Sequence, residues 1–448
     1  MPGEEELRRR LFSVLREIYG KRELQAGDFK PLRDKVQYAG SVYGYEEVHS
    51  MINAILDGWF GVGKYVSKFE SKLADFLGTK KALMVNSGSS ANLVAMASLT
   101  SRLLGEKRLK PGDEVITPAS TFPTTLNPIL QTGLSPVLID VKLSTYNIDP
   151  RLLKKALSKK TRAIMIPHTL GNPNEMDEIM EFVKEYNLFL IEDTSDSLGS
   201  RYDGKYLGTF GDFGTFSFFP AHHITTGEGG AVVTDNIELY RIALSIRDWG
   251  RACVNPVCNP QTCGDGQCPK SLRAKGKALW ENLPDDYDKR YSYSNLGYNL
   301  KPIEVQGAMG VAQMDRLPLF IEARKRNFRF LYDAAQSYKK YFHLPVSPPK
   351  SDPCWFAFPL TISEKAPFTR RQIVNHFTCA NIEVKLMFAG NITCHPAYKD
   401  VPMRVVGSLK NSDMIMRNTF FLGVYPGLTQ EKLMFMVKVF EDFMANYT

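Results

Sequence analysis

Short apolar and β-branched runs alternate with helical patterns from about Lys80 to Trp249, and this alternation constrains the fold more than any other feature. The runs cover residues 82–85, 114–117, 137–140, 163–167, 189–193, 215–219 and 231–234. Helical patterns lie between several of them, for example at 150–157 and 176–186. A chain that alternates in this way builds a mostly parallel sheet with helices on both faces. The sequence therefore predicts an α/β fold.

The chain is long enough to form two domains. It has 448 residues, 44% of them apolar, and can bury a large core. We predict an N-terminal helix and arm at 1–45, a large α/β domain at 46–300 with a Cys-rich insertion at 250–292, and a linking helix with a small α/β domain at 301–448. Within the last part we predict helices at 303–337, 370–379 and 430–447 and strands at 355–362 and 383–387.

Net charge and hydropathy limit the kinds of binding partner and the cellular compartment that we expect. The formal net charge is +8, from 56 Lys plus Arg against 48 Asp plus Glu, without a dense basic block that would indicate nucleic-acid binding. A modest positive charge is equally compatible with a small anionic substrate. No apolar run approaches the roughly 20 residues that span a bilayer, and the N-terminus lacks the apolar core of a signal peptide. We expect a cytoplasmic protein.

The segment from Val85 to Ala91 has the pattern of a phosphate-binding helix start. Its Asn-Ser-Gly-Ser-Ser sequence follows a predicted strand and opens an apolar helix. Gly88 allows a close approach of the backbone, and Ser89 and Ser90 place hydroxyls beside the free amides of the first turn. Taken alone, the same pattern is also that of an ordinary helix N-cap.

Two further residues could contact a bound ring. Asp193 ends a strong predicted strand, where a carboxylate can pair with a cationic ring nitrogen, although turn and N-cap aspartates are common there. Phe122 could stack on the face of such a ring, although a single loop phenylalanine is more often part of the core.

The segment from Ser217 to Gly230 resembles the lysine loop of pyridoxal-phosphate proteins. An apolar strand end precedes Ser217, a reactive position follows five residues later, and a Gly-rich turn closes the segment. In the sugar aminotransferases that it resembles, the reactive residue is a lysine that binds the cofactor as a Schiff base. Here His222 occupies that position. An imidazole cannot form the imine, but it can transfer protons near neutral pH.

From about Ala39 onward the chain resembles the DegT/StrS sugar aminotransferase family, and within it the CDP-4-keto-6-deoxyglucose 3-dehydrases, which carry histidine at this position. The segments that carry the resemblance are 56–59, 85–91, 113–116, 122–125, 167–172, 219–225, 247–251, 296–299 and 388–391. The resemblance implies a fold-type-I aminotransferase-like architecture in which the large domain binds pyridoxal or pyridoxamine 5′-phosphate. It also implies a homodimer with shared active sites.

The resemblance assigns roles to individual residues. It implies that His222 is the catalytic base, that Asp193 binds the ring nitrogen, and that Ser89 and Ser90 bind the phosphate. Further cofactor contacts are expected from Gly88, Phe122, Ser217 and His223, the last serving orientation or packing. Asn299 would reach the phosphate of the neighbouring subunit, and Asp196 stands where family aminotransferases tend to carry glutamine near the ring hydroxyl. Substrate contacts are expected from Lys385, Phe388 and Asn391.

Four of the seven cysteines lie within one short stretch, as Cys253, Cys258, Cys263 and Cys268. The dehydrases that the chain resembles carry an iron–sulfur cluster, and four thiolates are the number that such a cluster needs. We predict these four as its ligands, in a [2Fe–2S] rather than a [4Fe–4S] cluster. The dehydrases that the chain resembles also take a ligand just after the Glu-Asp strand end, where this chain has Thr194 and Ser195. Either Cys268 supplies the missing ligand, or the cluster differs in type or is lost. Zinc is the main alternative, and four unligated surface thiols are the third, because exposed free cysteines are prone to oxidation.

These features predict a nucleotide-diphosphate-4-keto-6-deoxyhexose 3-dehydrase of 3,6-dideoxyhexose biosynthesis. A flavin/iron–sulfur reductase would deliver the electrons through the cluster. The first alternative is a dehydratase without a cluster, of the GDP-4-keto-6-deoxymannose type. The second is a non-catalytic binding or regulatory protein on the same fold.

Overall fold

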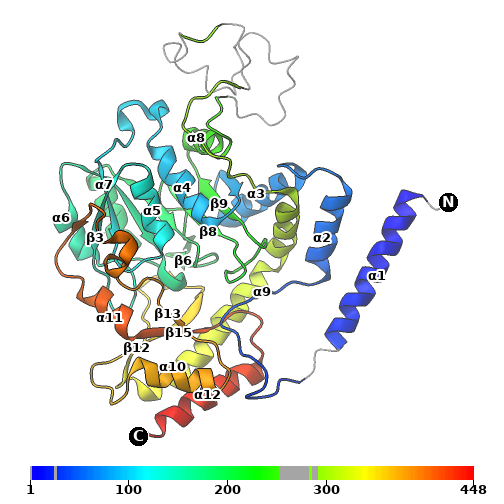
Figure 1. Cartoon of the computed structure of the whole chain (residues 1–448), viewed down its shortest axis with the longest axis vertical. Coiled ribbons are helices and arrows are strands. Elements are labelled where there is room, and N and C mark those ends of the chain that lie inside the picture. The colour runs from blue at the N-terminus through cyan, green and yellow to red at the C-terminus, as the bar shows by residue number, and fades with distance from the viewer. Residues whose placement is uncertain (1–2, 25–27, 253–281, 285–290, 448) are drawn as a thin grey trace.

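The computed structural model describes residues 3–24, 28–252, 282–284 and 291–447. They form a large sheet, a smaller sheet and a minor three-stranded sheet (Figure 1). The strands are β1 Lys81–Val85, β2 Glu114–Pro118, β3 Ser135–Ile139, β4 Thr161–Pro167, β5 Phe189–Asp193, β6 Arg201–Tyr202, β7 Lys205–Tyr206, β8 Phe213–Ser217, β9 Gly230–Thr234, β10 Phe342–His343, β11 Ser351–Asp352, β12 Ala357–Ile362, β13 Lys385–Leu386, β14 Arg404–Val405 and β15 Thr419–Gly423.

Helices cover these sheets and connect them. They are α1 Glu4–Leu24, α2 Tyr45–Leu56, α3 Lys64–Leu77, α4 Gly88–Leu99, α5 Pro123–Gln131, α6 Leu153–Ala156, α7 Met176–Glu185, α8 Ile237–Arg247, α9 Glu304–Ala335, α10 Arg370–Cys379, α11 Lys410–Asn418 and α12 Gln430–Met444. Among the described residues, no helix combines the length and the apolar character that crossing a membrane requires.

The large sheet has the strand order β1-β9-β8-β5-β4-β2-β3-β14, and each of the seven predicted runs supplies one of its strands. The central strands pair in parallel, whereas β9 runs antiparallel to both β1 and β8. Two reversals restore the direction, so β1 and β8 run the same way. The carboxyl ends of β1, β2, β4, β5 and β8 therefore meet at one edge of the sheet, where ligands bind in α/β folds.

Both faces of the large sheet are buried, as expected for parallel strands between helices. Alternate residues of β1 show the division, since Leu83 packs into the core with α4 and α8 whereas Met84 packs into the core with α3 and α9. The residues of β4 are divided likewise. Met165 packs into the same core as Leu83, whereas Ile164 packs into a core on the opposite face that includes residues of α7. The predicted mostly parallel α/β architecture is confirmed.

Helix α9 runs from α2 and α3 to the smaller sheet, which Figure 1 shows beside α10 and α12. It matches the predicted helix at 303–337, apart from its last turn, which is a 3-10 turn at Gln336–Tyr338. The smaller sheet has the order β10-β12-β15-β13 and contains both strands predicted for this part. β15 and α11 were not predicted.

The exposure of α1 and the position of β14 were not expected from the sequence. Helix α1 forms as predicted, but its apolar side chains are exposed, with Leu7 at 50% and Ile18 at 43% of full exposure. In the C-terminal part, Arg404 and Val405 form β14, which pairs in parallel with β3 and extends the large sheet. The division into domains at 45 and 300 stays a prediction. The pairing of β14 with β3 joins residues from beyond 300 to the large sheet.

Candidate active site

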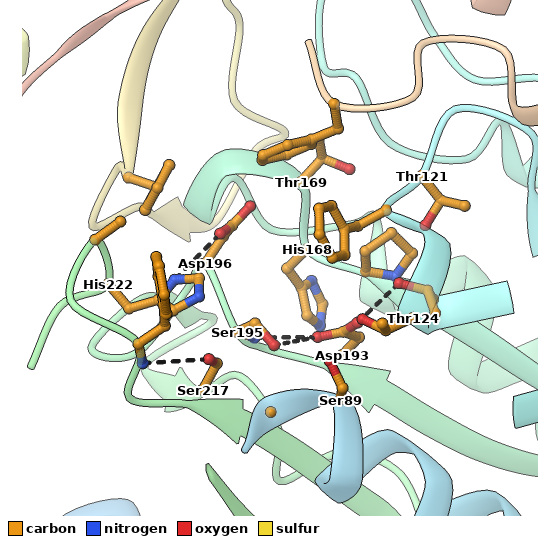
Figure 2. Close-up of a pocket in the computed structure, with 18 of the residues that line it drawn as sticks. Ser89, Thr121, Thr124, His168, Thr169, Asp193, Ser195, Asp196, Ser217 and His222 are labelled. Carbon is orange, nitrogen blue, oxygen red and sulfur yellow. Dashed lines mark hydrogen bonds and ion pairs between the residues drawn. The ribbon is translucent and has the colours of Figure 1, made fainter. Parts of the chain in front are cut away.

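A cavity of about 380 Å³ lies at the edge where the strand ends meet (Figure 2). Its walls come from the carboxyl ends of the central strands, the N-terminal turn of α4, the loop after β8 and the smaller sheet's flank. The lining residues are Tyr38, Ser87, Gly88, Ser89, Thr121, Phe122, Thr124, Thr125, Pro167, His168, Thr169, Asp193, Ser195, Asp196, Ser217, Phe219, Ala221, His222, Glu228, Phe356 and Phe388. This set contains no lysine.

The N-terminus of α4 forms one end of the cavity. Ser87 caps the helix, since its Oγ accepts a hydrogen bond from the Ser90 amide at 3.1 Å. A Cβ atom on Gly88 would lie 2.4 Å from the Cβ of Ser217, so only glycine lets these two segments meet. Ser89 and Ser217 line the cavity as predicted, while Ser90 bonds to Ser87 and lies outside it. Free amides and hydroxyls at a helix start suit a phosphate.

Asp193 lies at the floor of the cavity, at the end of β5. Its Oδ2 accepts hydrogen bonds from Asn92 Nδ2 and Thr125 Oγ1, both at 2.8 Å. Its Oδ1 accepts from the Ser195 hydroxyl at 2.7 Å and the Ser195 amide at 3.2 Å. Four donors favour a carboxylate held as an anion in one orientation. Such a group can pair with a protonated ring nitrogen, which is the predicted role.

His168 is a lining residue that the sequence did not single out. Its Nδ1 accepts a hydrogen bond from the Asn174 amide at 3.1 Å, so its Nε2 is the nitrogen that donates to Glu192 Oε2. Glu192 in turn accepts three backbone N–H groups, from Gly208, Phe210 and Gly211. The imidazole is therefore fixed as one neutral tautomer beneath the cavity. The sequence signal that could have predicted it is its position: His168 directly follows the predicted strand that ends at Pro167, and Asp193 ends the next predicted strand along the chain.

His222 lies opposite Asp193, in the loop between β8 and β9. Its Nδ1 is 3.4 Å from Asp196 Oδ1, and its ring centroid is 5.4 Å from that of Phe356. Figure 2 shows both His222 and Asp196 facing the cavity. Burial, aided by the charge of Arg324, lowers the pKa of His222 to about 3. The imidazole is therefore unprotonated at neutral pH, as a base must be.

Asp196 has the opposite shift. Burial, with a smaller effect from the negative charge of Asp193, raises the pKa of Asp196 to about 7. Near neutral pH the carboxyl is thus partly protonated beside an unprotonated imidazole. The pair can hold one proton next to the cavity.

His223 points away from the cavity. Its Nε2 lies 2.9 Å from the carbonyl oxygen of Cys354, to which it donates, and its side chain is buried. The residue does not line the cavity, and the geometry is that of an anchor for the loop that carries His222.

Of the remaining predicted residues, two line the cavity and three lie outside its lining. Phe122 and Phe388 line its mouth in edge-to-face contact, with centroids 5.9 Å apart. Lys385 lies outside the lining, above the ring of Tyr38 and paired with Glu383. Asn391 is buried and caps a 3-10 turn while donating to Asp413 at 2.7 Å. Asn299 is exposed and pairs with Asp248 away from this cavity.

The four predicted metal ligands Cys253, Cys258, Cys263 and Cys268 lie outside the described residues. Within the described part of the chain, no group of three or more His, Cys, Asp or Glu side chains could hold a metal ion. Thr194 and Ser195 connect the strands beneath the cavity, since the Thr194 hydroxyl donates to the carbonyl oxygen of Thr215 on β8 and the Ser195 hydroxyl donates to Asp193 on β5.

The cavity fits a pyridoxamine-type cofactor. The helix start can hold a phosphate, Asp193 can hold a ring nitrogen, and His222 lines the same cavity with an imidazole that can accept a proton. The buried hydroxyls of Thr121 and Thr169 line the cavity without a hydrogen-bond partner, as expected where a ligand completes the site. Sheet order and cavity together define the class as a fold-type-I pyridoxal-phosphate protein.

The family follows from comparison with known sequences. The model of the DegT/DnrJ/EryC1/StrS aminotransferase family matches residues 43–441, and the chain belongs to this family. It is 47% identical to the lipopolysaccharide biosynthesis protein RfbH of Salmonella typhimurium, over 95% of this chain and 96% of that protein. It is 45% identical to the dTDP-4-dehydro-2,6-dideoxy-D-glucose 3-dehydratase of Saccharopolyspora spinosa, over 98% of this chain and 92% of that protein.

Solved structures agree with this assignment. The Escherichia coli GDP-4-keto-6-deoxy-D-mannose-3-dehydratase with bound hydrated PLP superposes with a TM-score of 0.81 at 32% identity, covering 91% of this chain and 99% of that one. The predicted family and fold class are confirmed.

The pKa of Asp196 makes a testable prediction about stability. Because the folded-state pKa is raised from 3.8 to about 7, the neutral carboxyl favours folding below pH 4, and this advantage is lost as the pH rises through 7. Asp196→Asn should therefore be more stable than the wild type above pH 7, by about 4 kcal/mol at most. Urea unfolding at pH 4, 5.5 and 7.5 measures the difference. The exposed Asp203→Asn variant is the control, and a difference independent of pH would contradict the prediction.

Proposed function

We propose that the chain is a pyridoxamine-phosphate-dependent nucleotide-diphosphate-4-keto-6-deoxyhexose 3-dehydrase. The observation that carries the proposal is the unprotonated His222 facing Asp193 across a cavity whose lining contains no lysine. The Saccharopolyspora spinosa and Escherichia coli relatives, named as sugar 3-dehydratases, support the reaction class. Biosynthesis of 3,6-dideoxyhexoses in the cytoplasm is the setting that this activity implies.

Each end of the cavity has a distinct task in this proposal. The α4 start with Ser89 and Ser217 binds the cofactor phosphate, and Asp193 binds the ring nitrogen. Pyridoxamine phosphate, when bound, supplies an amine that condenses with a ketone and a ring that accepts electrons. His222 removes a proton from the C4′ carbon, and Asp196 keeps the imidazole oriented through Nδ1. Phe122 and Phe388 offer an apolar mouth to the deoxy sugar.

The net deoxygenation needs electrons as well as protons. In the net reaction two electrons and two protons convert the C3–OH group to C3–H and water, one proton going into the water and the other into the new C–H bond. We propose that a flavin/iron–sulfur reductase supplies the electrons and that Cys253, Cys258, Cys263 and Cys268 hold a [2Fe–2S] cluster that accepts them. The support is the clustering of four of seven cysteines and the resemblance to the iron–sulfur dehydrases.

The proposed active unit is a homodimer. Exposed aromatic and aliphatic side chains flank Asn299, among them Leu296 at 97% and Tyr298 at 36% of full exposure. A backbone hydrogen bond joins Tyr298 to the exposed Trp249, and another joins the exposed Phe60 to the start of α9, so several exposed apolar residues lie on or next to the segment 296–304. Such surfaces mark protein interfaces. A second subunit covering this surface would allow Asn299 to reach the partner's cofactor phosphate.

A dehydratase that works without a cluster is the second candidate. It is favoured by the likeness to the Escherichia coli GDP-4-keto-6-deoxy-D-mannose-3-dehydratase, a relative that covers most of the chain. Both candidates use the same cavity and the same base, and they differ only in the source of the reducing electrons.

Substitution of the two histidines tests the base. We expect His222→Asn to lower substrate-dependent deuterium exchange at the cofactor C4′ by at least a hundredfold, because the amide cannot accept the proton. Binding of pyridoxamine phosphate should remain within about threefold of the wild type. His223→Asn is the matched control and should retain exchange. The assignment is wrong if the His223 variant alone loses exchange.

Metal analysis and one cysteine variant test the cluster. Anaerobically purified protein should contain iron and sulfide and show sulfur-to-iron charge-transfer absorption. Cys263→Ser should abolish net 3-deoxygenation with the reductase but retain C4′ exchange, because proton removal precedes electron delivery. Cys379→Ser, at an exposed free cysteine, is the control. Stoichiometric zinc without iron would rule out electron transfer through the cluster and favour the second candidate.

Disruption of the apolar surface tests the dimer. Leu296→Asp should convert the protein to a monomer in sedimentation experiments, because a carboxylate cannot be buried unpaired in an interface. Its affinity for pyridoxamine phosphate should fall with the loss of Asn299 from the partner. Leu319→Asp, at another leucine with 65% exposure, should remain dimeric. A Leu296 variant that stays dimeric would contradict the proposed interface.

A further inference from the structure

Arg324 is a buried cation that does not line the cavity and has no part in the proposed proton or electron transfer. It lies on α9, and its side chain retains 1% of its full exposure. Its Nη2 donates to the carbonyl oxygen of His222 at 2.8 Å and reaches that of Ala221 at 3.4 Å, while its Nη1 donates to the carbonyl oxygen of Phe356 at 3.0 Å. One guanidinium therefore binds the backbone of the residue that carries the proposed base.

The same guanidinium joins two walls of the cavity. Phe356 precedes β12 and donates its amide to the carbonyl oxygen of Leu170, which follows β4. Its ring contacts that of His222. The His222 loop, the segment before β12 and the loop after β4 are thus connected through one side chain and one backbone hydrogen bond. A shift of Arg324 would move the base relative to Asp193.

The cost of burying this charge argues for a specific role. Arg324 donates its hydrogen bonds to carbonyl oxygens and lies 5.9 Å from the ring centroid of Phe356, and within the described part of the chain no carboxylate forms an ion pair with it. Burial lowers its pKa to about 10, against the opposing attraction of more distant groups that include Asp196. A methionine or leucine would fill this space without the desolvation penalty. The planar fork of the guanidinium, however, can bind two backbone segments at once.

Charge adds to this geometric effect. The titratable groups facing His222 are Asp196 at its Nδ1, Arg324 behind its carbonyl and the neighbouring His223. A fixed positive charge disfavours a second one on the imidazole, and it is the next cause after burial of the low pKa of His222. Arg324 thus favours the form of His222 that accepts a proton.

We propose that Arg324 is a positioning residue that holds the backbone of His222 against the segment before β12 and keeps its imidazole in the proton-accepting form. The catalytic consequence rests on the proposed function, whereas the effect on His222 itself does not.

Two substitutions separate the geometry from the charge. Arg324→Lys keeps the charge but cannot bridge the two segments with a planar fork, and Arg324→Gln keeps donors but removes the charge. We expect at least a tenfold fall in C4′ exchange for the lysine variant, with affinity for pyridoxamine phosphate within about threefold of the wild type. For the glutamine variant, the acid limb of the exchange rate should move to higher pH, because the pKa of His222 rises towards its ordinary value.

Arg316→Lys is the matched control. Arg316 lies on the same helix, is partly exposed and binds Glu47 instead of the His222 loop. It should leave exchange and its pH profile within about twofold of the wild type. A merely structural role for Arg324 would lower the melting temperature and the cofactor affinity together and leave the pH profile of the surviving enzyme unchanged. That result would overturn the proposal, as would wild-type exchange in Arg324→Lys.

A measurement without substrate keeps the proposal separate from the proposed function. In protein labelled with ¹⁵N-histidine, with His222→Asn to assign the signal, the wild-type His222 ring should remain neutral from pH 5 to 8. In Arg324→Gln it should titrate at a higher pH than in the wild type. Titration of wild-type His222 near pH 6.5 would overturn the proposal even if neither variant folds. Absence of exchange in the wild type, with the NMR result intact, would count against the dehydrase and not against Arg324.

Discussion

The reversed strand β9 is the constraint on which the site depends. By running antiparallel to both of its neighbours, it turns β1 and β8 in the same direction and brings their carboxyl ends to the edge where β4 and β5 also end. Its first residue, Gly230, touches the turn before α4, where a Cβ would lie 2.3 Å from the carbonyl oxygen of Ser87. The helix start and the His222 loop can adjoin one cavity only because these backbones meet so closely.

Electrostatics then differentiate the groups around this cavity. Asp193 receives four hydrogen bonds and is held as an anion, whereas burial and the neighbouring Asp193 raise the pKa of Asp196, three residues later, to about 7 against the opposing effect of one backbone hydrogen bond from Leu170. Two carboxyl groups of the same loop thus acquire different charges, as is common where acids and bases are assigned separate tasks. His222 completes the set as a neutral base between Asp196 and the buried cation Arg324.

Sequence alone predicted the elements that local patterns encode. Buried strands are continuous apolar runs, so the seven strands of the large sheet were found, and the motif around Ser89 placed the start of α4. Direction and edge pairing carry no such pattern. The antiparallel course of β9 and the two-residue strand β14 were therefore missed, as was the contact of Arg324 with His222, which spans 102 positions. Asn391 was selected by resemblance, yet its side chain caps a turn, because an asparagine in a motif does not reveal where its amide points.

Strand β14 has a consequence for the way in which a substrate enters. The C-terminal part of the chain is fastened to the large sheet twice, once through α9 and once through the pairing of Arg404 and Val405 with β3, where Arg404 also forms an ion pair with Glu114. These two connections restrain rigid-body displacement of the C-terminal part relative to the large sheet. Phe122 and Phe388 line the mouth from the two parts of the chain that these connections join, so a substrate enters through an opening whose two sides are tied together by β14 and α9.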